Sequence, residues 1–211
     1  MKRIAVLISG QGNNLQALIN ACKTDFIHAK IVTVISDKEN AFGLERARNT
    51  AVPTKVFLRK HFADNQEMDR NIGDYLQNLD IDLIVLAGYM KILTQEFVQR
   101  FEGKIINIHP SLLPKYPGIN TYQRAMESGD KEHGTTIHFV NEEVDGGAVI
   151  LQAKVPIFPE DTIEDIELRT REQEYKLYPL AVKWFIEERL KLIAGKAYLD
   201  NQLLPPQGYA D

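Results

Sequence analysis

Apolar runs rich in β-branched residues alternate with amphipathic helical patterns through the first half of the sequence. The runs occupy residues 4–9, 31–36, 54–58 and 82–88, and the helical patterns lie between them at 13–23, 41–50 and 63–79. Strands that are apolar on both faces and separated by helices are typical of a parallel sheet covered by crossover helices. The sequence therefore predicts an α/β fold with a doubly wound sheet.

The second half of the sequence changes this pattern. A helix near residues 94–101 leads to a fifth strand at 104–109, and two further β-rich runs, 135–140 and 148–156, are separated by "NEEVDGG". A short polar connection that ends in Asp-Gly-Gly favours antiparallel pairing over another crossover. We therefore expect a mostly parallel sheet of about seven strands, with antiparallel strands near the end and helices on both faces.

One long helix should follow the sheet. Asp161 and Glu164 stand three residues apart, as in a capping box, at the start of an amphipathic segment that continues past Pro179. Proline removes a helical hydrogen bond and clashes with the preceding turn, so we expect Pro179 to kink or divide this helix. The closing "LPPQGYAD" is typical of a proline-rich tail.

Composition argues against several classes of protein. The 211 residues carry a net charge of −4 without a basic stripe, which disfavours nucleic acid as a partner, and no apolar run approaches the roughly 20 residues of a membrane span. The first apolar run is shorter than the core of a usual signal peptide, so we interpret it as a strand. The single cysteine, Cys22, cannot form an internal disulfide and lies on the apolar face of the first helical pattern, so we expect a core residue in a cytoplasmic protein.

A glycine-containing loop, "SGQGNN", joins the first strand to the first helix. Gly10 and Gly12 allow the backbone to approach a ligand closely, the free amides at the helix start attract an anion, and Asn13 and Asn14 add side-chain donors. The loop by itself fits a monophosphate site best. A dinucleotide site and a purely structural tight turn are the alternatives.

The dinucleotide alternative depends on Asp37, which follows the second strand. An acidic residue at that point holds the ribose of a nicotinamide cofactor in dinucleotide-binding folds. The corresponding fingerprint also needs a third glycine, and this sequence has Leu15 in that position. The monophosphate interpretation is therefore the stronger of the two.

The stretch "IINIHPSLLPKYPG" ends the fifth predicted strand with two polar residues. Residues two apart on a strand face the same side, so Asn107 and His109 should project together at the carboxyl end of the strand, where open α/β sheets bind ligands. Three prolines oppose a helix in the segment that follows. An amide donor beside an imidazole suits a carbonyl that becomes an oxyanion during nucleophilic attack.

A nearby carboxylate would help an imidazole to hold a proton. The best candidate is Asp145, because the two glycines after it permit a bend toward the strand end. Taken separately, His109 and Asp145 are each more typical of turn residues. His133 lies in a polar turn and His138 alternates with apolar residues, so both are weaker candidates, and a zinc site formed by His109, His138 and Asp145 lacks a short-range ligand pair.

Six stretches together resemble one enzyme family. In chain order, "ISGQGNNLQALI", "LAGYMKIL", "NIHPSLLPKYPG", "EHGTTIHFV", "VDGGAVILQ" and "LPPQGY" are similar to the phosphoribosylglycinamide formyltransferases, the folate-dependent enzymes of purine synthesis. The resemblance runs from Ile4 to Tyr209. It implies transfer of a formyl group from the co-substrate 10-formyltetrahydrofolate to the primary amine of glycinamide ribonucleotide, without a metal.

The resemblance also implies roles for individual residues. The catalytic set is Asn107, His109 and Asp145. The site for glycinamide ribonucleotide comprises Gly12, Asn13, Asn14 and Glu174. The folate pocket comprises Met90, Lys91, Ile92, Leu93, Asn141 and Val144. We expect a single domain over residues 1–211, with a nucleotide-phosphate half at about 1–100 and a catalytic and folate half at about 101–211.

Two positions depart from the family pattern. Asn65 stands where the family can carry an arginine that reaches the glutamate tail of the folate, and Arg59, Lys60 and Arg70 are the candidates to replace it. Lys91 stands where arginine is common.

Three alternatives remain open. A hydrolase of the same folate shares the Asn, His and Asp arrangement but usually carries an additional amino-terminal domain, and methionyl-tRNA formyltransferase has a further carboxyl-terminal domain. A non-catalytic nucleotide or folate sensor would keep the fold alone. No convincing Ser or Cys nucleophile accompanies the catalytic set, which favours direct attack through a tetrahedral intermediate. We expect small-molecule substrates only, and a monomer or a homodimer.

Overall fold

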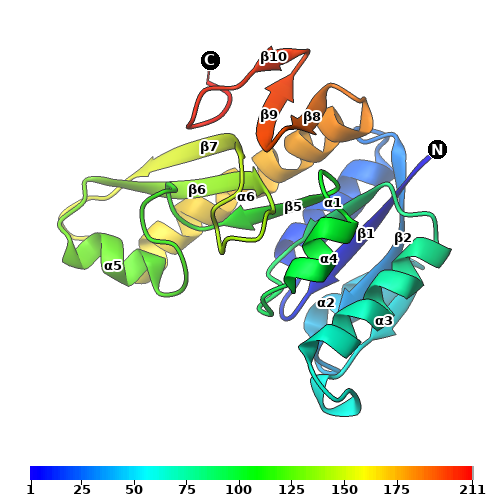
Figure 1. Cartoon of the computed structure of the whole chain (residues 1–211). Coiled ribbons are helices and arrows are strands. Elements are labelled where there is room, and N and C mark those ends of the chain that lie inside the picture. Colours follow the sequence, from blue (N-terminus) through cyan, green and yellow to red (C-terminus); the bar gives the residue numbers. More distant parts are fainter. Residues whose placement is uncertain (211) are drawn as a thin grey trace. The chain divides into compact units, whose positions relative to one another are not determined.

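The computed structural model describes residues 1–210, and seven of its strands form one mixed sheet (Figure 1). The order along the sheet is β3-β2-β1-β4-β5-β6-β7. Neighbouring strands from β3 to β5 pair in parallel, whereas β6 and β7 pair antiparallel. The predicted sheet, mostly parallel with antiparallel strands at its end, is confirmed. The chain divides into two compact units, Met1–Asn107 and Ile108–Asp211; the single domain stays a prediction.

The first unit alternates strands and helices. In chain order its elements are β1 (Lys2–Ile8), α1 (Asn13–Lys23), β2 (Ala29–Ser36), α2 (Phe42–Asn49), β3 (Thr54–Val56), the 3-10 turn η1 (Arg59–His61), α3 (Asn65–Asn78), β4 (Leu83–Leu86), α4 (Gln95–Arg100) and β5 (Ile105–His109), which reaches the next unit. From β1 the chain adds β2 and β3 on one side and then β4 and β5 on the other. Right-handed crossovers therefore put α1 and α2 on one face of the sheet and α3 and α4 on the other. In agreement, α1 contacts α2, and α3 contacts α4.

The central position of β1 follows from its sequence. Its residues from Ile4 to Ile8 are apolar and almost completely buried, as expected of a strand covered by helices on both faces. The strand order reverses at the boundary between β1 and β4, so the loops that leave these two strands diverge. Such a switch point is where open α/β sheets bind ligands. It places the glycine loop and the segment after β4 at one end of the first unit.

The second unit contains a hairpin, a long helix and a small additional sheet. In chain order its elements are α5 (Thr121–Glu127), β6 (Glu132–Phe139), β7 (Val149–Pro156), α6 (Ile163–Ile186), β8 (Leu190–Ile193), β9 (Lys196–Leu199) and β10 (Gln202–Leu203). Helix α6 packs on β6 and β7, and its residues Ile166 and Tyr178 are fully buried. The last three strands form an antiparallel sheet in the order β10-β9-β8.

Helix α6 begins one residue later than the sequence predicts and is not divided at Pro179. Thr162, not Asp161, is the N-cap, and its hydroxyl accepts the backbone N–H of Asp165, whose carboxylate accepts the backbone N–H of Thr162. The capping box is therefore shifted by one residue from the predicted Asp161 and Glu164 pair. The helix continues through Pro179 without being divided, because proline interrupts only one hydrogen bond of a helix that is anchored on both sides by buried residues, and the kink expected there stays a prediction.

Other parts of the second unit were absent from the sequence prediction. Helix α5 and the small sheet carry only short, weakly periodic patterns, which local sequence does not identify. The proline-rich tail packs in an ordered way, since Tyr209 bridges to Leu151 and stacks edge-on against Trp184. In the first unit, Cys22 is partly exposed instead of a core residue, although burial raises the pKa of its thiol to about 11. No helix within residues 1–210 is both long and apolar enough to span a membrane.

Gly147 is the tightest position of the β6–β7 connection. A Cβ atom at Gly147 would lie 1.7 Å from the carbonyl oxygen of Phe139, whereas a Cβ atom at Gly10 would meet nothing within 4 Å. We expect Gly147→Ala to lower the free energy of unfolding by about 1–3 kcal/mol, because backbone must shift to relieve the overlap. Urea unfolding measures this loss. Gly10→Ala is the control without an overlap, and an equal loss in both variants would contradict the prediction.

Candidate active site

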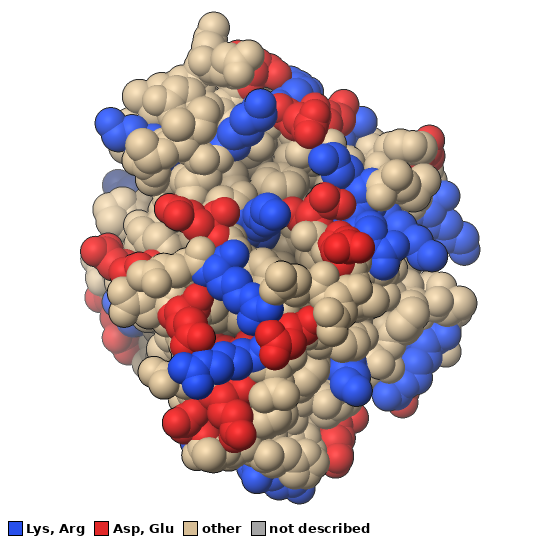
Figure 2. Space-filling view, turned by 45° about the vertical axis from the view of Figure 1, so that its right-hand side comes forward, with Lys and Arg blue, Asp and Glu red and all other residues tan. Residues whose placement is uncertain are grey.

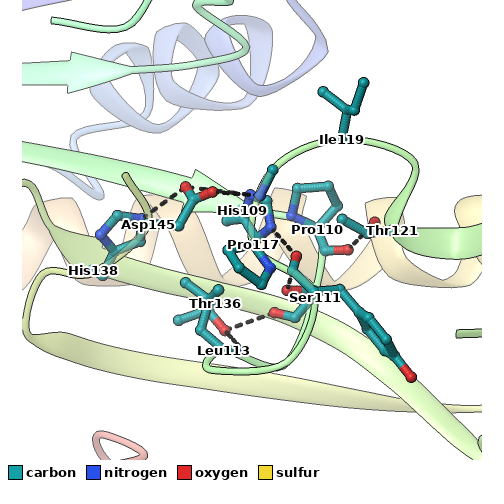
Figure 3. Close-up of polar contacts among 12 residues, drawn as sticks. His109, Pro110, Ser111, Leu113, Pro117, Ile119, Thr121, Thr136, His138 and Asp145 are labelled. Carbon is teal, nitrogen blue, oxygen red and sulfur yellow. Dashed lines mark hydrogen bonds and ion pairs between the residues drawn. The ribbon is translucent and has the colours of Figure 1, made fainter. Parts of the chain in front are cut away.

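His109 ends β5 and is held at both ring nitrogens within the second unit. Its Nε2 lies 2.8 Å from the carbonyl oxygen of Tyr116, and its Nδ1 lies 3.5 Å from Oδ1 of Asp145 (Figure 3). A carbonyl oxygen only accepts hydrogen bonds, so Nε2 carries a hydrogen and donates it. An imidazolium in this place would donate toward Tyr116 and toward Asp145 at the same time.

Buried hydroxyl groups shape the loop that supplies the Tyr116 carbonyl. The Ser111 hydroxyl is fully buried and lies 3.2 Å from the same carbonyl oxygen. Thr136 on β6 accepts the backbone N–H of Leu113 at 3.1 Å and donates to the carbonyl of Ser111 at 2.7 Å. The loop after β5 is therefore irregular, as its prolines predict, but its backbone groups are fixed by side chains beneath it.

Asp145 lies in the β6–β7 connection and faces two imidazoles. Its backbone takes a positive φ of 54°, which aspartate tolerates better than most residues, and its Oδ2 accepts the backbone N–H of Gly118 at 2.9 Å. Its Oδ1 lies 3.5 Å from Nδ1 of His109 and 4.0 Å from Nε2 of His138. The structure thus brings His109 and Asp145 together, and their catalytic roles stay predictions.

His138 also belongs to this cluster, although its alternation with apolar residues made it a weaker candidate in the sequence. Its Nδ1 donates to the carbonyl of Phe139 at 2.9 Å, so its Nε2 faces Asp145 (Figure 3). The register of the β6–β7 pair is irregular between Ile137 and His138, and a bulge of this kind redirects a side chain. Burial lowers the pKa of His138, so its ring is neutral near neutral pH. Simple alternation along the strand did not reveal this.

Asn107 and Glu174 occupy different units. Asn107, partly exposed, is the last residue of the first unit and stands two residues before His109 on β5, so strand alternation directs both side chains to one side. Glu174, on α6, is buried, and its Oε1 accepts the hydroxyl of Thr135, which also lies 3.0 Å from the carbonyl of His109. The roles of Asn107 in catalysis and of Glu174 in substrate binding stay predictions.

The glycine loop packs closely against the start of α2. Gly12 has a φ of 74°, and a Cβ atom there would lie 2.7 Å from Cα of Gly43, so only glycine fits. The Arg46 guanidinium donates to the carbonyl of Gln11 at 2.7 Å and to Oδ1 of Asn13 at 2.9 Å. A cation beside the amino terminus of α1 suits an anionic ligand. Asn13 and Asn14 begin that helix, as predicted.

The residues predicted for the folate pocket fall into two groups, one in each unit. In the first unit, Met90 and Ile92 are each 68% exposed, whereas the Lys91 ammonium lies 3.0 Å from the buried carboxylate of Asp69. Leu93 is partly exposed. In the second unit, Val144 is exposed.

Asn141, also predicted for the folate pocket, forms a turn. Its Oδ1 accepts the backbone N–H of Glu143 at 2.9 Å, and its amide donates to the carbonyl of Gly146. This side chain therefore has a structural use in the loop that carries Asp145. Its contact with folate stays a prediction.

The cations near Asn65 have different surroundings. Arg59 donates from Nε to Oδ1 of Asn65 at 2.9 Å, which keeps a guanidinium at this position. Arg70 is instead paired with Glu96 at 2.9 Å. Of the candidates to replace the expected arginine, Arg59 is thus the one that contacts Asn65 directly.

Surface charge is mixed on the face shown in Figure 2, where acidic and basic side chains lie interspersed. Among the charged side chains of residues 1–210, Arg169 is paired with Asp161 and Arg189 with Asp200. No group of three or more His, Cys, Asp or Glu side chains within residues 1–210 is placed to hold a metal ion. The expectations about nucleic acid and metal stay predictions.

Comparison with known proteins identifies the family. The model of the family described as "Formyl transferase" matches residues 2–182. The chain belongs to the formyl transferase family. The predicted resemblance is thereby confirmed.

Relatives named phosphoribosylglycinamide formyltransferase are similar to this chain over nearly its whole length. Phosphoribosylglycinamide formyltransferase of Haemophilus influenzae is 68% identical over all of both chains, and that of Escherichia coli is 51% identical over 98% of each. The solved structure of phosphoribosylglycinamide formyltransferase from Coxiella burnetii is 39% identical, covers 99% of this chain and 98% of that one, and has a TM-score of 0.95.

His133 lies buried in β6 and not in the expected polar turn, because the strand begins at Glu132, and with the buried His138 it should make the stability of this family member depend on pH. Burial lowers the pKa of both His133 and His138 in the folded chain, so below about pH 6.5 the unfolded chain binds more protons. The free energy of unfolding should therefore fall as the pH falls below this value, by up to about 1.4 kcal/mol per pH unit for each histidine. Urea unfolding between pH 7 and 5 measures the slope, and His133→Gln should reduce it. An unchanged slope would contradict the prediction.

Proposed function

We propose that this chain transfers the formyl group of 10-formyltetrahydrofolate to the primary amine of glycinamide ribonucleotide in de novo purine synthesis. The observation that carries the proposal is the imidazole of His109, held between the Tyr116 carbonyl and the Asp145 carboxylate in a member of the formyl transferase family. The names of the relatives, which match the whole chain at up to 68% identity among those compared, support the same reaction.

In the proposed reaction one carbon–nitrogen bond forms and another carbon–nitrogen bond breaks. The neutral amine nitrogen attacks the formyl carbon, which forms a carbon–nitrogen bond and moves the carbonyl electrons onto oxygen. The bond between this carbon and N10 of the folate then breaks as the carbonyl re-forms. One proton leaves the amine and one arrives at N10, so the products are formylglycinamide ribonucleotide and tetrahydrofolate.

His109 and Asn107 stabilise the oxyanion in this proposal. The imidazole contact at Nδ1, 3.5 Å from Asp145, is longer than a hydrogen bond, whereas Nε2 donates to Tyr116 at 2.8 Å. In the imidazolium form both ring nitrogens carry a hydrogen, and the Nδ1–H is therefore the donor that turns more easily to a developing oxyanion. Asp145 keeps negative charge beside that ring and orders a water molecule for proton transfer from the amine to N10.

In this proposal, orientation of the two reactants supplies the largest part of the rate acceleration. Holding an amine and a formyl donor in reacting geometry contributes on the order of 7 kcal/mol or more. Each well-placed oxyanion donor adds roughly 3 kcal/mol. The rigid support of His109 by buried groups of its own unit is consistent with catalysis that depends on positioning.

The remaining predicted residues bind the two small molecules. The proposal assigns the nucleotide phosphate to Gly12, Asn13 and Asn14, next to the Arg46 guanidinium. It assigns the folate to the segment 90–93 and to the β6–β7 connection, with Arg59 as the cation nearest Asn65 for the glutamate tail. The reaction needs no metal, and we place it in the cytoplasm. We retain a monomer or a homodimer as the expected state.

Folate release on addition of the amine distinguishes the activities. Purified protein incubated with 10-formyltetrahydrofolate should release tetrahydrofolate, seen as a change of absorbance, only when glycinamide ribonucleotide is added. Release without the amine would instead identify a folate hydrolase. No release in either case, with folate still bound in calorimetry, would identify a sensor.

Asp145→Asn tests the assigned carboxylate. Removal of the charge beside His109 should lower kcat by about 100-fold or more, since both oxyanion stabilisation and proton transfer are weakened. The KM for glycinamide ribonucleotide should change little, because the proposed phosphate site lies in the other unit. Initial rates across pH measure both constants. Near-normal kcat at every pH would reject the role of Asp145.

A further inference from the structure

Asp69 on α3 is a buried carboxylate with two partners in the segment that follows β4. Its side chain is 1% exposed, its Oδ1 lies 3.0 Å from the ammonium of Lys91, and its Oδ2 accepts the backbone N–H of Thr94 at 2.8 Å. The Lys91 side chain is itself only 11% exposed. Removal of one partner would leave the other charge buried without compensation, so the pair constrains both groups.

A second buried contact fixes the other end of this segment. The Ser9 hydroxyl, at the end of β1, accepts the backbone N–H of Met90 at 2.9 Å and donates to the carboxylate of Asp37 at 2.7 Å. Asp37 therefore has a structural role, because its carboxylate accepts the hydrogen bond that orients the Ser9 hydroxyl. The backbone is anchored at Met90 by Ser9 and at Thr94 by Asp69.

These anchors determine which side chains face solvent. Met90 and Ile92 are each 68% exposed, while Lys91 between them turns inward to Asp69. Two large apolar side chains on a rigid backbone form a surface suited to a flat aromatic ring system. An inward lysine cannot reach a ligand on that surface without leaving a buried carboxylate unpaired.

We propose that Asp69 is a positioning residue for folate recognition and that Lys91 is an internal brace of the segment, with no contact to the glutamate tail of the folate. The inference rests on the proposed function, because that function assigns the folate to residues 90–93. It gives lysine at position 91 a role that needs a point charge, which pairs with one oxygen of the Asp69 carboxylate, and not the bidentate fork of an arginine.

Asp69→Asn tests the positioning role, and Asp74→Asn is its matched control. Asp74 lies on the same helix and pairs with Arg100 on α4 at 2.9 Å, but it is exposed and does not contact the segment. We expect Asp69→Asn to raise the KM for 10-formyltetrahydrofolate by about tenfold, equivalent to roughly 1.4 kcal/mol. The KM for glycinamide ribonucleotide and kcat should change less than about twofold. Asp74→Asn should leave all three constants as in the unmodified protein.

Lys91→Met separates a brace from a direct ligand, and serves as the second variant if Asp69→Asn folds poorly by circular dichroism. A brace predicts that the KM rises by the same factor for 10-formyltetrahydrofolate and for 10-formyltetrahydropteroate, which lacks the glutamate. A rise confined to the folate would show contact with the tail and overturn the proposal. Unchanged KM values for both donors would overturn it as well.

Calorimetry with tetrahydrofolate distinguishes this inference from the proposed function. If the unmodified protein binds tetrahydrofolate but transfers no formyl group, the proposed function fails, and the positioning role is then tested by affinity alone. Asp69→Asn and Lys91→Met should each weaken this binding about tenfold. Affinity equal to that of the unmodified protein in both variants would reject the positioning role whatever the activity.

Discussion

The hydrogen bond from His109 to the carbonyl of Tyr116 fixes the orientation on which the candidate active site depends. At 2.8 Å it is shorter than the 3.5 Å contact between Nδ1 and Asp145, so the carbonyl decides which ring nitrogen carries the hydrogen in the neutral form. The other nitrogen is then aimed at the carboxylate. A fixed ring direction determines where the charged form of the side chain presents its second hydrogen.

Buried polar side chains hold the irregular loop that follows His109 and the irregular segment that carries residues 90–93. Ser111 and Thr136 fix the loop after β5, and Ser9 and Asp69 fix the segment after β4. In each case a hydroxyl or carboxylate binds backbone groups that a regular helix or strand would otherwise pair. Irregular backbone thereby becomes rigid, which is the condition for holding two reactants in one geometry.

Periodicity in the sequence was sufficient to predict the main sheet and the helices of the first unit. The apolar runs at 4–9 and 82–88 have a single favourable place, in buried parallel strands, and the spacing of Asn107 and His109 follows from strand geometry. Features that depend on distant partners were not accessible in this way. The bulge that turns His138 toward Asp145, the carboxylate of Asp69 beneath Lys91 and the small sheet at the end of the chain have no local signal.

Nitrogen-15 NMR of the His109 ring tests the central claim most directly. In protein labelled with ¹⁵N-histidine, and at a pH where the imidazole is neutral, the Tyr116 carbonyl should hold the hydrogen on Nε2. The Nε2 resonance should then show a directly bonded hydrogen and the Nδ1 resonance should show none, with His109→Gln used to assign the signals. A hydrogen on Nδ1 with a bare Nε2 would contradict the account, because a bare nitrogen cannot lie 2.8 Å from a carbonyl oxygen as a hydrogen-bond partner.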